Sequence, residues 1–576
     1  MIEGINSNAE KKLDTSILLE VKNLSISFKQ DDVIVPVVKN ISFNLHPGKL
    51  TAIVGESGSG KSVTALSLLQ LLPAGARVTG QLQFTSDKGS SGDLLTSDLA
   101  AIRKIRGNEI AMIFQEPMTS LNPVFTCGSQ VMESLVLHKK ISSKEAMLKT
   151  IQLFEQVELP QPAAMLKRYP HEISGGQKQR VMIAMAMSCS PTLLIADEPT
   201  TALDVRVQKN ILQLLKKLQV QEKMSVLFIT HDLGLVAAFA DEVLVMHKGI
   251  IVEQGDSKQV LQNPQHTYTK ALLACKPQKE SKGKRLRVVA DFLQNDIVVE
   301  VSPLPVAIQT SSPAITQTPV LQVENLKVYF PAKKNIWGGA LSFYKAVDDV
   351  SFTVQQGETI GLVGESGCGK TTLGRSILQL VKPTSGKIVL HSKEIQQLST
   401  RAMRNLRKDL QIVFQDPYGS LNPRITIGEA ILEPLMVHKM HPNKIVGKEK
   451  VMELLKQVNM SADIYNRYPH QFSGGQRQRI CIARALGLEP SFLIFDESVS
   501  ALDVSVQAQV LNLINDLKQQ YQFTSIFISH DLSVVHYVSD RILVMNQGKI
   551  VEEGLARDIM NNPQQPYTQA LIEAIP

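Results

Sequence analysis

Long apolar runs are missing from this chain of 576 residues, and no stretch approaches 18 consecutive apolar side chains. A helix that crosses a bilayer needs about 20 predominantly apolar residues, so we expect no membrane-spanning segment. The N-terminus, residues 1–16, is polar and mixed in charge. We expect it to be disordered and to carry no secretory signal. A function at a membrane would therefore require a partner that spans it.

Cysteine is also scarce, and its spacing shows neither a Cys-x-x-Cys pair nor a metal-ligand pattern. The cysteines are Cys127, Cys189, Cys275, Cys368 and Cys481. The simplest interpretation is a reduced, intracellular compartment.

A strong charge imbalance is absent too: the net charge of +7 permits an anionic membrane surface or nucleic acid as partner but requires neither. The length is enough for about four compact units.

A glycine-rich segment occurs twice. Residues 55–62 read GESGSGKS and residues 364–371 read GESGCGKT, and both fit the P-loop pattern G-x-x-x-x-G-K-[ST]. Glycines let consecutive backbone N–H groups approach phosphate oxygens, the lysine adds a cation, and the final hydroxyl is a ligand for Mg²⁺. Each copy follows a short apolar run and precedes a helix-like stretch, which places phosphate at a helix N-terminus. The chain is predicted to bind nucleotide.

The chain as a whole is one unit repeated. Residues 19–24 recur at 321–326, residues 114–123 at 414–423, and residues 174–177 at 473–476. The separation of equivalent residues falls from 309 (Lys61 to Lys370) to 300 (Gln115 to Gln415), because the first copy has a Gly/Ser/Asp-rich insert near residues 87–98. We predict a disordered segment at 1–16, domains at 17–278 and 319–576, and a linker at 279–318. Its basic start favours a solvated linker over contact with anionic lipid or RNA.

Apolar runs that end in acid follow in both halves, LLIADE at residues 193–198 and FLIFDE at 492–497. A buried strand that delivers Asp197 or Asp496 to Mg²⁺ is the Walker B arrangement. The adjacent Glu198 and Glu497 are placed to polarise an attacking water. His231 and His530 end later apolar runs in the same register, and we interpret them as contacts to the γ-phosphate. These glutamates and histidines are the predicted catalytic residues.

Together these motifs resemble the ATP-binding-cassette ATPases, and the resemblance covers both repeats almost end to end. It implies an α/β fold of tandem P-loop NTPase domains, each a RecA-like core with an antiparallel β subdomain and an α-helical subdomain. It implies signature motifs at residues 173–177 and 472–476. It further implies Q-loop glutamines, D-loop aspartates and an adenine-stacking aromatic in each half, with ATP and Mg²⁺ as cofactors.

The residues predicted to bind ATP are Phe28, Gly55, Ser57, Gly58, Ser59, Gly60, Lys61, Ser62, Thr64, Gln115, Ser174, Gly175, Gly176, Gln177, Asp204, Phe330, Gly364, Ser366, Gly367, Cys368, Gly369, Lys370, Thr371, Thr372, Gln415, Ser473, Gly474, Gly475, Gln476 and Asp503. The predicted Mg²⁺ ligands are Ser62, Gln115, Asp197, Thr371, Gln415 and Asp496. In the family two cassettes close head to tail. The resemblance therefore implies an intramolecular pairing of the two ATPase domains, Lys61 with Ser473 and Lys370 with Ser174.

The two repeats differ at two points near these motifs. Met185 stands in the first signature helix where the second has Arg484, which puts the local ion pairing of the first copy in doubt. After the Walker B acid the first copy continues with Pro199 and the second with Ser498. Neither change removes a predicted phosphate, metal or water contact, so both sites are expected to hydrolyse ATP.

The segments after the Q-loops and the domain ends, residues 263–273 and 562–572, resemble the oligopeptide/dipeptide importer ATPases, in particular the fused glutathione and microcin-type subgroup. This implies an ATP-hydrolysing subunit that energises peptide import through two integral-membrane permease subunits, with an extracytoplasmic substrate-binding protein. It would lie peripherally on the cytoplasmic face of the inner membrane, without nucleic acid. Since only Cys275 lies where some relatives bind an iron–sulfur cluster, no such cluster is expected. The alternative is a soluble tandem cassette ATPase acting on ribosomes or nucleic acid, which the short Pro-rich linker disfavours.

Overall fold

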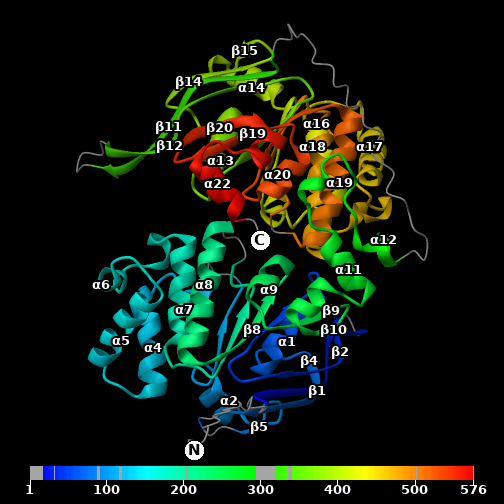
Figure 1. The fold of residues 1–576 in the computed structure, drawn as a ribbon. Helices are drawn as coiled ribbons and strands as arrows, with labels where there is room; N and C mark the ends of the chain where they lie inside the picture. The colour runs from blue at the N-terminus through cyan, green and yellow to red at the C-terminus, as the bar shows by residue number, and fades with distance from the viewer. Residues whose placement is uncertain are drawn as a thin grey trace, which may run out of the picture. The chain divides into compact units, whose positions relative to one another are not determined.

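The computed structural model describes residues 17–30, 33–86, 88, 91–115, 120–200, 205–293, 319–334, 340–500 and 502–574 (Figure 1). Two compact units are present, one formed by Met1–Thr201 and Ile211–Thr269, the other by Ala202–Asn210 and Lys270–Pro576. The predicted disordered N-terminus and the later part of the predicted linker lie outside the described residues. Within the described ranges, no helix has the length and apolar character needed to cross a bilayer.

The first unit is built around a six-stranded sheet with the order β10-β9-β3-β8-β7-β6. Its strands are β3 (Leu50–Val54), β6 (Ile110–Ile113), β7 (Leu193–Asp197), β8 (Ser225–Thr230), β9 (Glu242–His247) and β10 (Ile250–Asp256). All neighbours are parallel except β9 and β10. The strands β3, β7 and β8 are buried throughout, as expected for apolar strands in a parallel sheet covered on both faces. Ligands of such open sheets bind beyond the carboxyl ends of the strands.

A second, antiparallel sheet of the first unit has the order β2-β1-β4-β5. It contains β1 (Leu19–Gln30), β2 (Val33–Leu45), β4 (Ala76–Thr85) and β5 (Ser91–Asp93). The core joins both sheets, because Leu19 and Phe84 of the antiparallel sheet cluster with Ile53 and Ile195 of the parallel one. The helices of the first repeat are α1 (Lys61–Leu68), α2 (Leu99–Ile105), α4 (Cys127–Lys139), α5 (Ser143–Gln156), α6 (Pro162–Met165), α7 (Gly175–Met187), α8 (Val205–Glu222), α9 (Leu233–Phe239), α10 (Ser257–Gln262) and α11 (Thr267–Ala274).

The second unit repeats this plan, with one sheet ordered β16-β17-β18-β13-β19-β20 and another ordered β12-β11-β14-β15. The strands are β11 (Leu321–Lys334), β12 (Ala340–Val354), β13 (Thr359–Val363), β14 (Ser385–Leu390), β15 (Lys393–Glu394), β16 (Leu410–Val413), β17 (Phe492–Asp496), β18 (Thr524–Ile528), β19 (Arg541–Asn546) and β20 (Lys549–Leu555). The helices are α13 (Lys370–Ile377), α14 (Thr400–Leu406), α15 (Pro417–Ser420), α16 (Ile427–Val437), α17 (Lys444–Gln457), α18 (Gly474–Leu486), α19 (Val504–Tyr521), α20 (Leu532–Val538), α21 (Ala556–Asn561) and α22 (Pro566–Glu573). The predicted α/β class, with a parallel core, an antiparallel sheet and a helical segment in each repeat, is confirmed.

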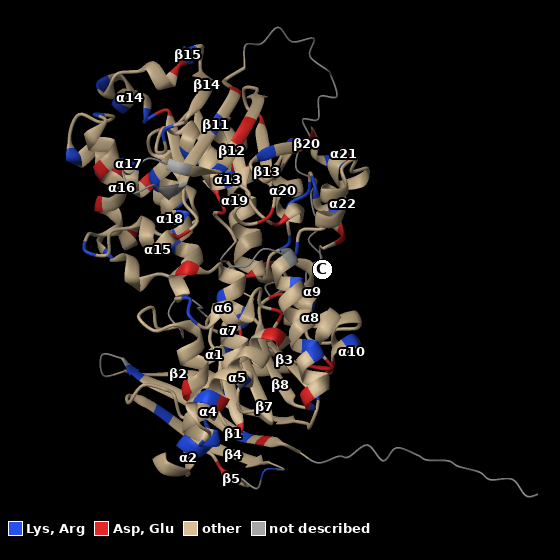
Figure 2. Ribbon diagram, turned by 90° about the vertical axis from the view of Figure 1, so that its left-hand side faces the viewer, with Lys and Arg blue, Asp and Glu red and all other residues tan. Residues whose placement is uncertain are grey.

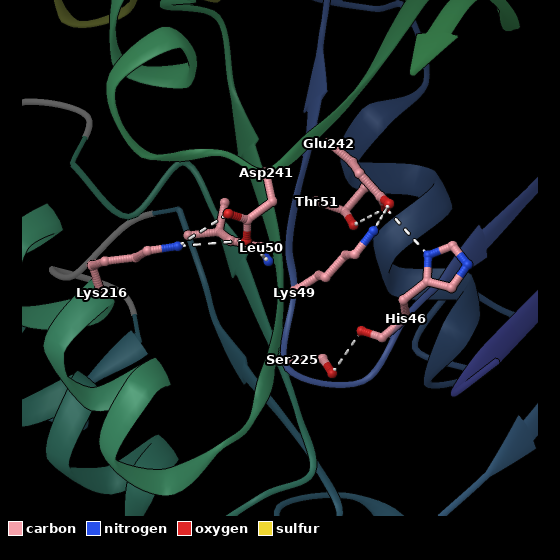
Figure 3. Close-up of polar contacts among 8 residues, drawn as sticks. All are labelled: His46, Lys49, Leu50, Thr51, Lys216, Ser225, Asp241 and Glu242. Carbon is pink, nitrogen blue, oxygen red and sulfur yellow. Dashed lines mark hydrogen bonds and ion pairs between the residues drawn. The ribbon is translucent and has the colours of Figure 1, made fainter. Parts of the chain in front are cut away.

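Strand β3 is anchored at the end opposite its P-loop (Figure 3). Lys49 Nζ donates to Glu242 over 2.5 Å, and His46 Nδ1 lies 3.3 Å from the same carboxylate. The backbone N–H of Leu50 donates to Asp241 over 2.8 Å. Burial alone would raise the pKa of Glu242, but Lys49 and His46 outweigh it and lower that pKa. The strand that carries the first P-loop is therefore held by charged contacts to β9.

The basic segment that begins the predicted linker is partly buried. Leu286 and Val289 are buried, and Arg285 forms an ion pair of 2.9 Å with Asp516 of α19. A short helix, α12 (Val289–Leu293), ends the described part of this segment. Apolar side chains and backbone groups hold the segment against the second unit, whereas the side chains of Lys279, Lys284 and Arg287 are exposed to solvent.

Candidate active site

Each P-loop joins the carboxyl end of a buried parallel strand to the N-terminus of a helix, β3 to α1 and β13 to α13. The N-cap residues Gly60 and Gly369 have φ angles of 103° and 112°, in the left-handed region that glycine tolerates. A Cβ at Gly369 would lie 2.0 Å from the carbonyl oxygen of Ala346, so no other residue fits there. At Gly58 and Gly367 a Cβ would meet nothing within 4 Å. The space beside these two glycines is therefore open.

The P-loop lysines are buried and bonded to their own loops. Lys61 Nζ donates to the carbonyl oxygens of Gly55 and Glu56 over 2.8 and 2.9 Å. Lys370 Nζ repeats these bonds with Gly364 and Glu365 over 2.7 and 2.9 Å. The lysines are only 5% and 3% exposed. A buried cation is stabilised by an anion, so these sites suit a polyphosphate.

A hydroxyl and a carboxylate meet in each half where Mg²⁺ is expected. Ser62 Oγ donates to Asp197 Oδ1 over 3.0 Å, and Thr371 Oγ1 donates to Asp496 Oδ1 over 2.9 Å. Burial, aided by the charge of Glu198, raises the pKa of Asp197 to about 6 although Ser62 and Lys61 oppose it. Burial also raises the pKa of Asp496. A nearby cation would stabilise the ionised form of each buried aspartate. Hydroxyl and carboxylate oxygens are also the donors that Mg²⁺ prefers, so each pair fits Mg²⁺.

The predicted catalytic glutamates share an unusual backbone conformation. Glu198 and Glu497 directly follow β7 and β17 and have φ angles of 44° and 46°. Residues other than glycine rarely adopt this left-handed conformation, and it costs about 1–3 kcal/mol. The N–H groups of Glu198 and Glu497 donate to Ile229 and Ile528 over 3.0 and 2.9 Å, which holds each turn in place. Both glutamates therefore follow their strands in the same backbone conformation.

Each glutamate is contacted by the predicted Q-loop and switch residues of its own repeat. Gln115 Nε2 donates to Glu198 Oε2 over 3.0 Å, and His231 Nδ1 lies 3.4 Å from Glu198 Oε1. In the second repeat His530 Nδ1 lies 3.6 Å and Lys370 Nζ 4.0 Å from the carboxylate of Glu497. Burial raises the pKa of Glu497, but His530 and Lys370 together outweigh it and leave that pKa below its usual value. Glu497 is therefore ionised at neutral pH.

The signature residues form the N-termini of α7 and α18. The hydroxyl of Ser174 accepts from the N–H of Gln177, and Gln177 Oε1 accepts from the N–H of Ser174 over 3.0 Å. Ser473 and Gln476 form the same capping box. Both serines are exposed. The glutamines therefore organise the helix start, whose free N–H groups and dipole favour an anion.

The remaining predicted contacts differ in how well their positions suit a ligand. Phe28 is partly buried against the core, whereas Phe330 is 40% exposed. Thr64 is fully buried, its hydroxyl donates to Gly60 O within α1 over 2.9 Å, and it lies one position later in the loop than Thr372. We therefore omit Thr64 from the proposed ATP contacts. Asp204 lies outside the described residues, and Asp503 is buried at the start of α19.

Two tyrosines that the motifs did not single out bind the P-loops. The N–H of Glu56 donates to the hydroxyl of Tyr268 over 3.1 Å, and the N–H of Glu365 donates to that of Tyr567 over 3.0 Å. Both tyrosines belong to the domain-end segments, at equivalent places after an Asn-Pro-Gln sequence. Their equivalent positions in the two repeats were the feature of the sequence that could have identified them. The domain ends thus support the phosphate loops.

The second repeat has further contacts that the first cannot form. Tyr344 donates from its hydroxyl to Gly367 O over 2.8 Å, and the residue at the corresponding place on β2, paired with Phe28, is Val35. Arg484 Nη1 donates to Ser420 O over 2.6 Å, whereas the first repeat has Met185. The second P-loop and the residues after its Q-loop are therefore held by additional bonds.

Comparison with protein families gives two matches. The family described as "ABC transporter" matches residues 38–201 and 347–500, more than half of the chain. The family described as "Oligopeptide/dipeptide transporter, C-terminal region" matches residues 252–293 and 551–576. Both matches occur once in each repeat, in agreement with the observed duplication.

Comparison with curated proteins agrees with these matches. The chain is 48% identical to the "Glutathione import ATP-binding protein GsiA" of Escherichia coli (strain K12), covering 98% of this chain and 90% of that protein. Its identity to the protein of the same name from Pectobacterium atrosepticum is 47%, over 97% and 89%. A dimeric post-hydrolysis structure of the ATP-binding cassette MJ0796 with ADP and Pi covers 41% of this chain and 98% of its own, with 26% identity and a TM-score of 0.37. The chain therefore belongs to the ABC transporter family, as an ATP-hydrolysing subunit with two fused cassettes and the oligopeptide/dipeptide type of C-terminal region in each.

Proposed function

We propose that this subunit hydrolyses ATP at both cassettes to energise the import of small peptides through two separate integral-membrane permeases. An extracytoplasmic binding protein would deliver the substrate, and the subunit would lie on the cytoplasmic face of the inner membrane. The observation that carries the proposal is the Ser62–Asp197 and Thr371–Asp496 pairing beside a buried P-loop lysine in each cassette. The names of the relatives, which refer to glutathione import, support a small peptide as substrate.

The residues of each site have separate chemical roles. The P-loop N–H groups with Lys61 or Lys370 bind the phosphates, and Ser62 with Asp197, or Thr371 with Asp496, would hold Mg²⁺. When bound, this ion neutralises charge on the phosphates. Glu198 and Glu497 accept a proton from the attacking water, and His231 and His530 orient the γ-phosphate. Gln115 and Gln415 complete the predicted shell of the ion.

We further propose that each site is completed by the signature of the other cassette, Ser473 facing Lys61 and Ser174 facing Lys370. The exposed, capped N-termini of α7 and α18 support this role. Cysteines at Ser57 and Ser473, introduced into a chain without the native cysteines, should cross-link when ATP is bound. Cross-linking that is as frequent between cysteines at Ser57 and Ser174 would contradict the head-to-tail arrangement.

Charge distribution supports transport over the alternative of a ribosome or nucleic-acid partner. Lys and Arg positions are interspersed with Asp and Glu positions along the ribbon in Figure 2. Nucleic-acid binding would call for clustered basic side chains. Affinity purification of the chain from its native membranes should recover two integral-membrane subunits, and their joint reconstitution should give peptide uptake that depends on ATP. Recovery of ribosomal proteins without permeases would overturn the proposal.

A further inference from the structure

Residues 279–289, which we call the docking segment, follow the first cassette in sequence but pack within the second unit. In Figure 1 the segment lies beside α19. Its centre is Leu286, whose N–H donates to Asn512 Oδ1 over 3.0 Å and whose carbonyl accepts from Asn512 Nδ2 over 2.8 Å. Leu286 and Asn512 are both only 4% exposed. One amide side chain thus satisfies both backbone groups of a buried leucine.

Further bonds fix the backbone of the docking segment on α20. The hydroxyl of Tyr537 donates to Lys284 O over 3.0 Å and lies 3.1 Å from Asn512 Oδ1. Lys282 Nζ donates to Ser539 O over 2.6 Å, at the end of α20. Because these bonds are directed to backbone carbonyls as well as to charges, the contact is more specific than attraction between a basic run and an acidic surface.

Outer contacts add charge recognition. Arg285 Nη1 lies 2.9 Å from both carboxylate oxygens of Asp516, a pair about half exposed to solvent. Lys279 Nζ donates to Met560 O over 3.3 Å, and the ring of His536 lies 3.4 Å from Lys279 O. The buried polar contacts supply most of the specificity, since exposed ion pairs contribute little.

The first cassette lacks this binding surface. At the separation of 299 that relates the repeats from Ser174 and Ser473 onward, Asn512 and Asp516 correspond to Gln213 and Lys217. Tyr537 corresponds to Ala238, which has no hydroxyl. Lys217 would repel Arg285 where Asp516 attracts it. The surface that receives the docking segment therefore exists in one cassette alone among the described residues.

We infer that the face formed by α19 and α20 of the second cassette is a dedicated peptide-binding site, and that its ligand is the chain's own docking segment. Occupancy of the site also holds α20 in place. Since α20 begins two residues after His530, the segment steadies the helix that adjoins the proposed switch histidine. This function goes beyond ATP binding and does not depend on which solute is imported.

Limited trypsin digestion of the full-length chain tests the inference, because the docking segment offers cleavage sites at Lys282, Lys284 and Arg285. A docked segment is cut only after it opens, so its cleavage should be slow in the native chain. We expect Asn512→Ala to accelerate cleavage there by at least about tenfold. The matched variant Gln213→Ala in the first cassette should leave the rate unchanged. Rapid cleavage of the unmodified chain in this segment would overturn the inference.

A charge exchange guards against misfolding of single variants. Arg285→Asp and Asp516→Arg should each speed hydrogen exchange at the amides of the docking segment, and the double variant should restore slow exchange. Hydrogen exchange gives the second readout: amides of α20 should exchange faster in Asn512→Ala, while those of α9, the equivalent helix of the first cassette, should not. Unchanged exchange in α20, or no recovery in the double variant, would refute the assigned site.

Discussion

The side-chain amide of Gln415 donates a hydrogen bond of 2.8 Å to a carboxylate oxygen of Glu497. Gln115 and Glu198 form the same bond over 3.0 Å. The proposed base of each site is therefore already held by the glutamine of its Q-loop. In this arrangement a displacement of the Q-loop would change which hydrogen bonds the carboxylate accepts.

The P-loop lysines should determine how many nucleotides the chain binds. Lys61→Ala removes the buried cation of the first site, and Lys370→Ala removes that of the second. Bonds to charged groups contribute about 1.5–3 kcal/mol each, so affinity at the altered site should fall at least about tenfold. Calorimetric titration with ATP should give two tight sites for the unmodified chain and one for each variant. The exposed Lys149→Ala serves as control, and two tight sites in either P-loop variant would contradict the assignment.

Asp197 should titrate far above an ordinary aspartate. Burial raises its pKa to about 6, so the nucleotide-free chain carries a protonated carboxyl at pH 5 and loses that proton as the pH rises through 6. Infrared difference spectra between pH 5 and pH 7 should show this carboxyl in the unmodified chain and not in Asp197→Asn. The ionised form present at neutral pH is the one that holds Mg²⁺. Identical spectra for the two proteins would contradict the shifted pKa.

The tyrosines of the domain ends should support ATP binding without taking part in ATP hydrolysis. Tyr268→Phe removes the acceptor of the Glu56 N–H in the first P-loop. An unsatisfied donor costs about 1–3 kcal/mol, so ATP affinity should fall about fivefold or more in a Lys370→Ala background that leaves the first site alone. The exposed Tyr169→Phe is the control. Unchanged affinity in Tyr268→Phe would show that the bond has no role in the loop.

Motifs with short-range spacing were predictable from the sequence, because chemistry sets that spacing. The P-loops, the acids at the ends of β7 and β17 and the capped signature helices all lie where the patterns place them. Thr64 shows the limit of such patterns, since the loop register alone did not reveal that its hydroxyl is bonded inside α1. Local spacing identifies which residues belong to a loop, but not the direction in which each side chain points.

Contacts between distant segments were not predictable. Tyr268 lies 212 positions from Glu56, and Leu286 lies 226 from Asn512. Basic composition suggested solvation for the docking segment, yet Lys282 donates to a backbone carbonyl and Leu286 is buried. Composition describes what side chains prefer on average, whereas here a surface with complementary backbone and side-chain groups overrides that preference.

Arg484 should stabilise the segment after the second Q-loop. Its guanidinium donates to Ser420 O over 2.6 Å, a charge-assisted bond that Arg484→Met removes. We expect a loss of about 1–3 kcal/mol in local stability, seen as faster hydrogen exchange in residues 415–421. Arg401→Met, an exposed arginine on α14, provides the matched control. Equal exchange in both variants would assign the bond no stabilising role.

Steady-state ATP hydrolysis by the chain carrying both Glu198→Gln and Glu497→Gln tests the central claim most directly. These changes preserve the size of the side chain and one acceptor oxygen but remove the group that accepts the proton of the attacking water. Hydrolysis should fall by about 10²–10⁴-fold while ATP remains bound, and the exposed Glu155→Gln and Glu453→Gln pair should hydrolyse normally. Hydrolysis near the unmodified rate in the first variant would show that the carboxylates following β7 and β17 are not the catalytic bases.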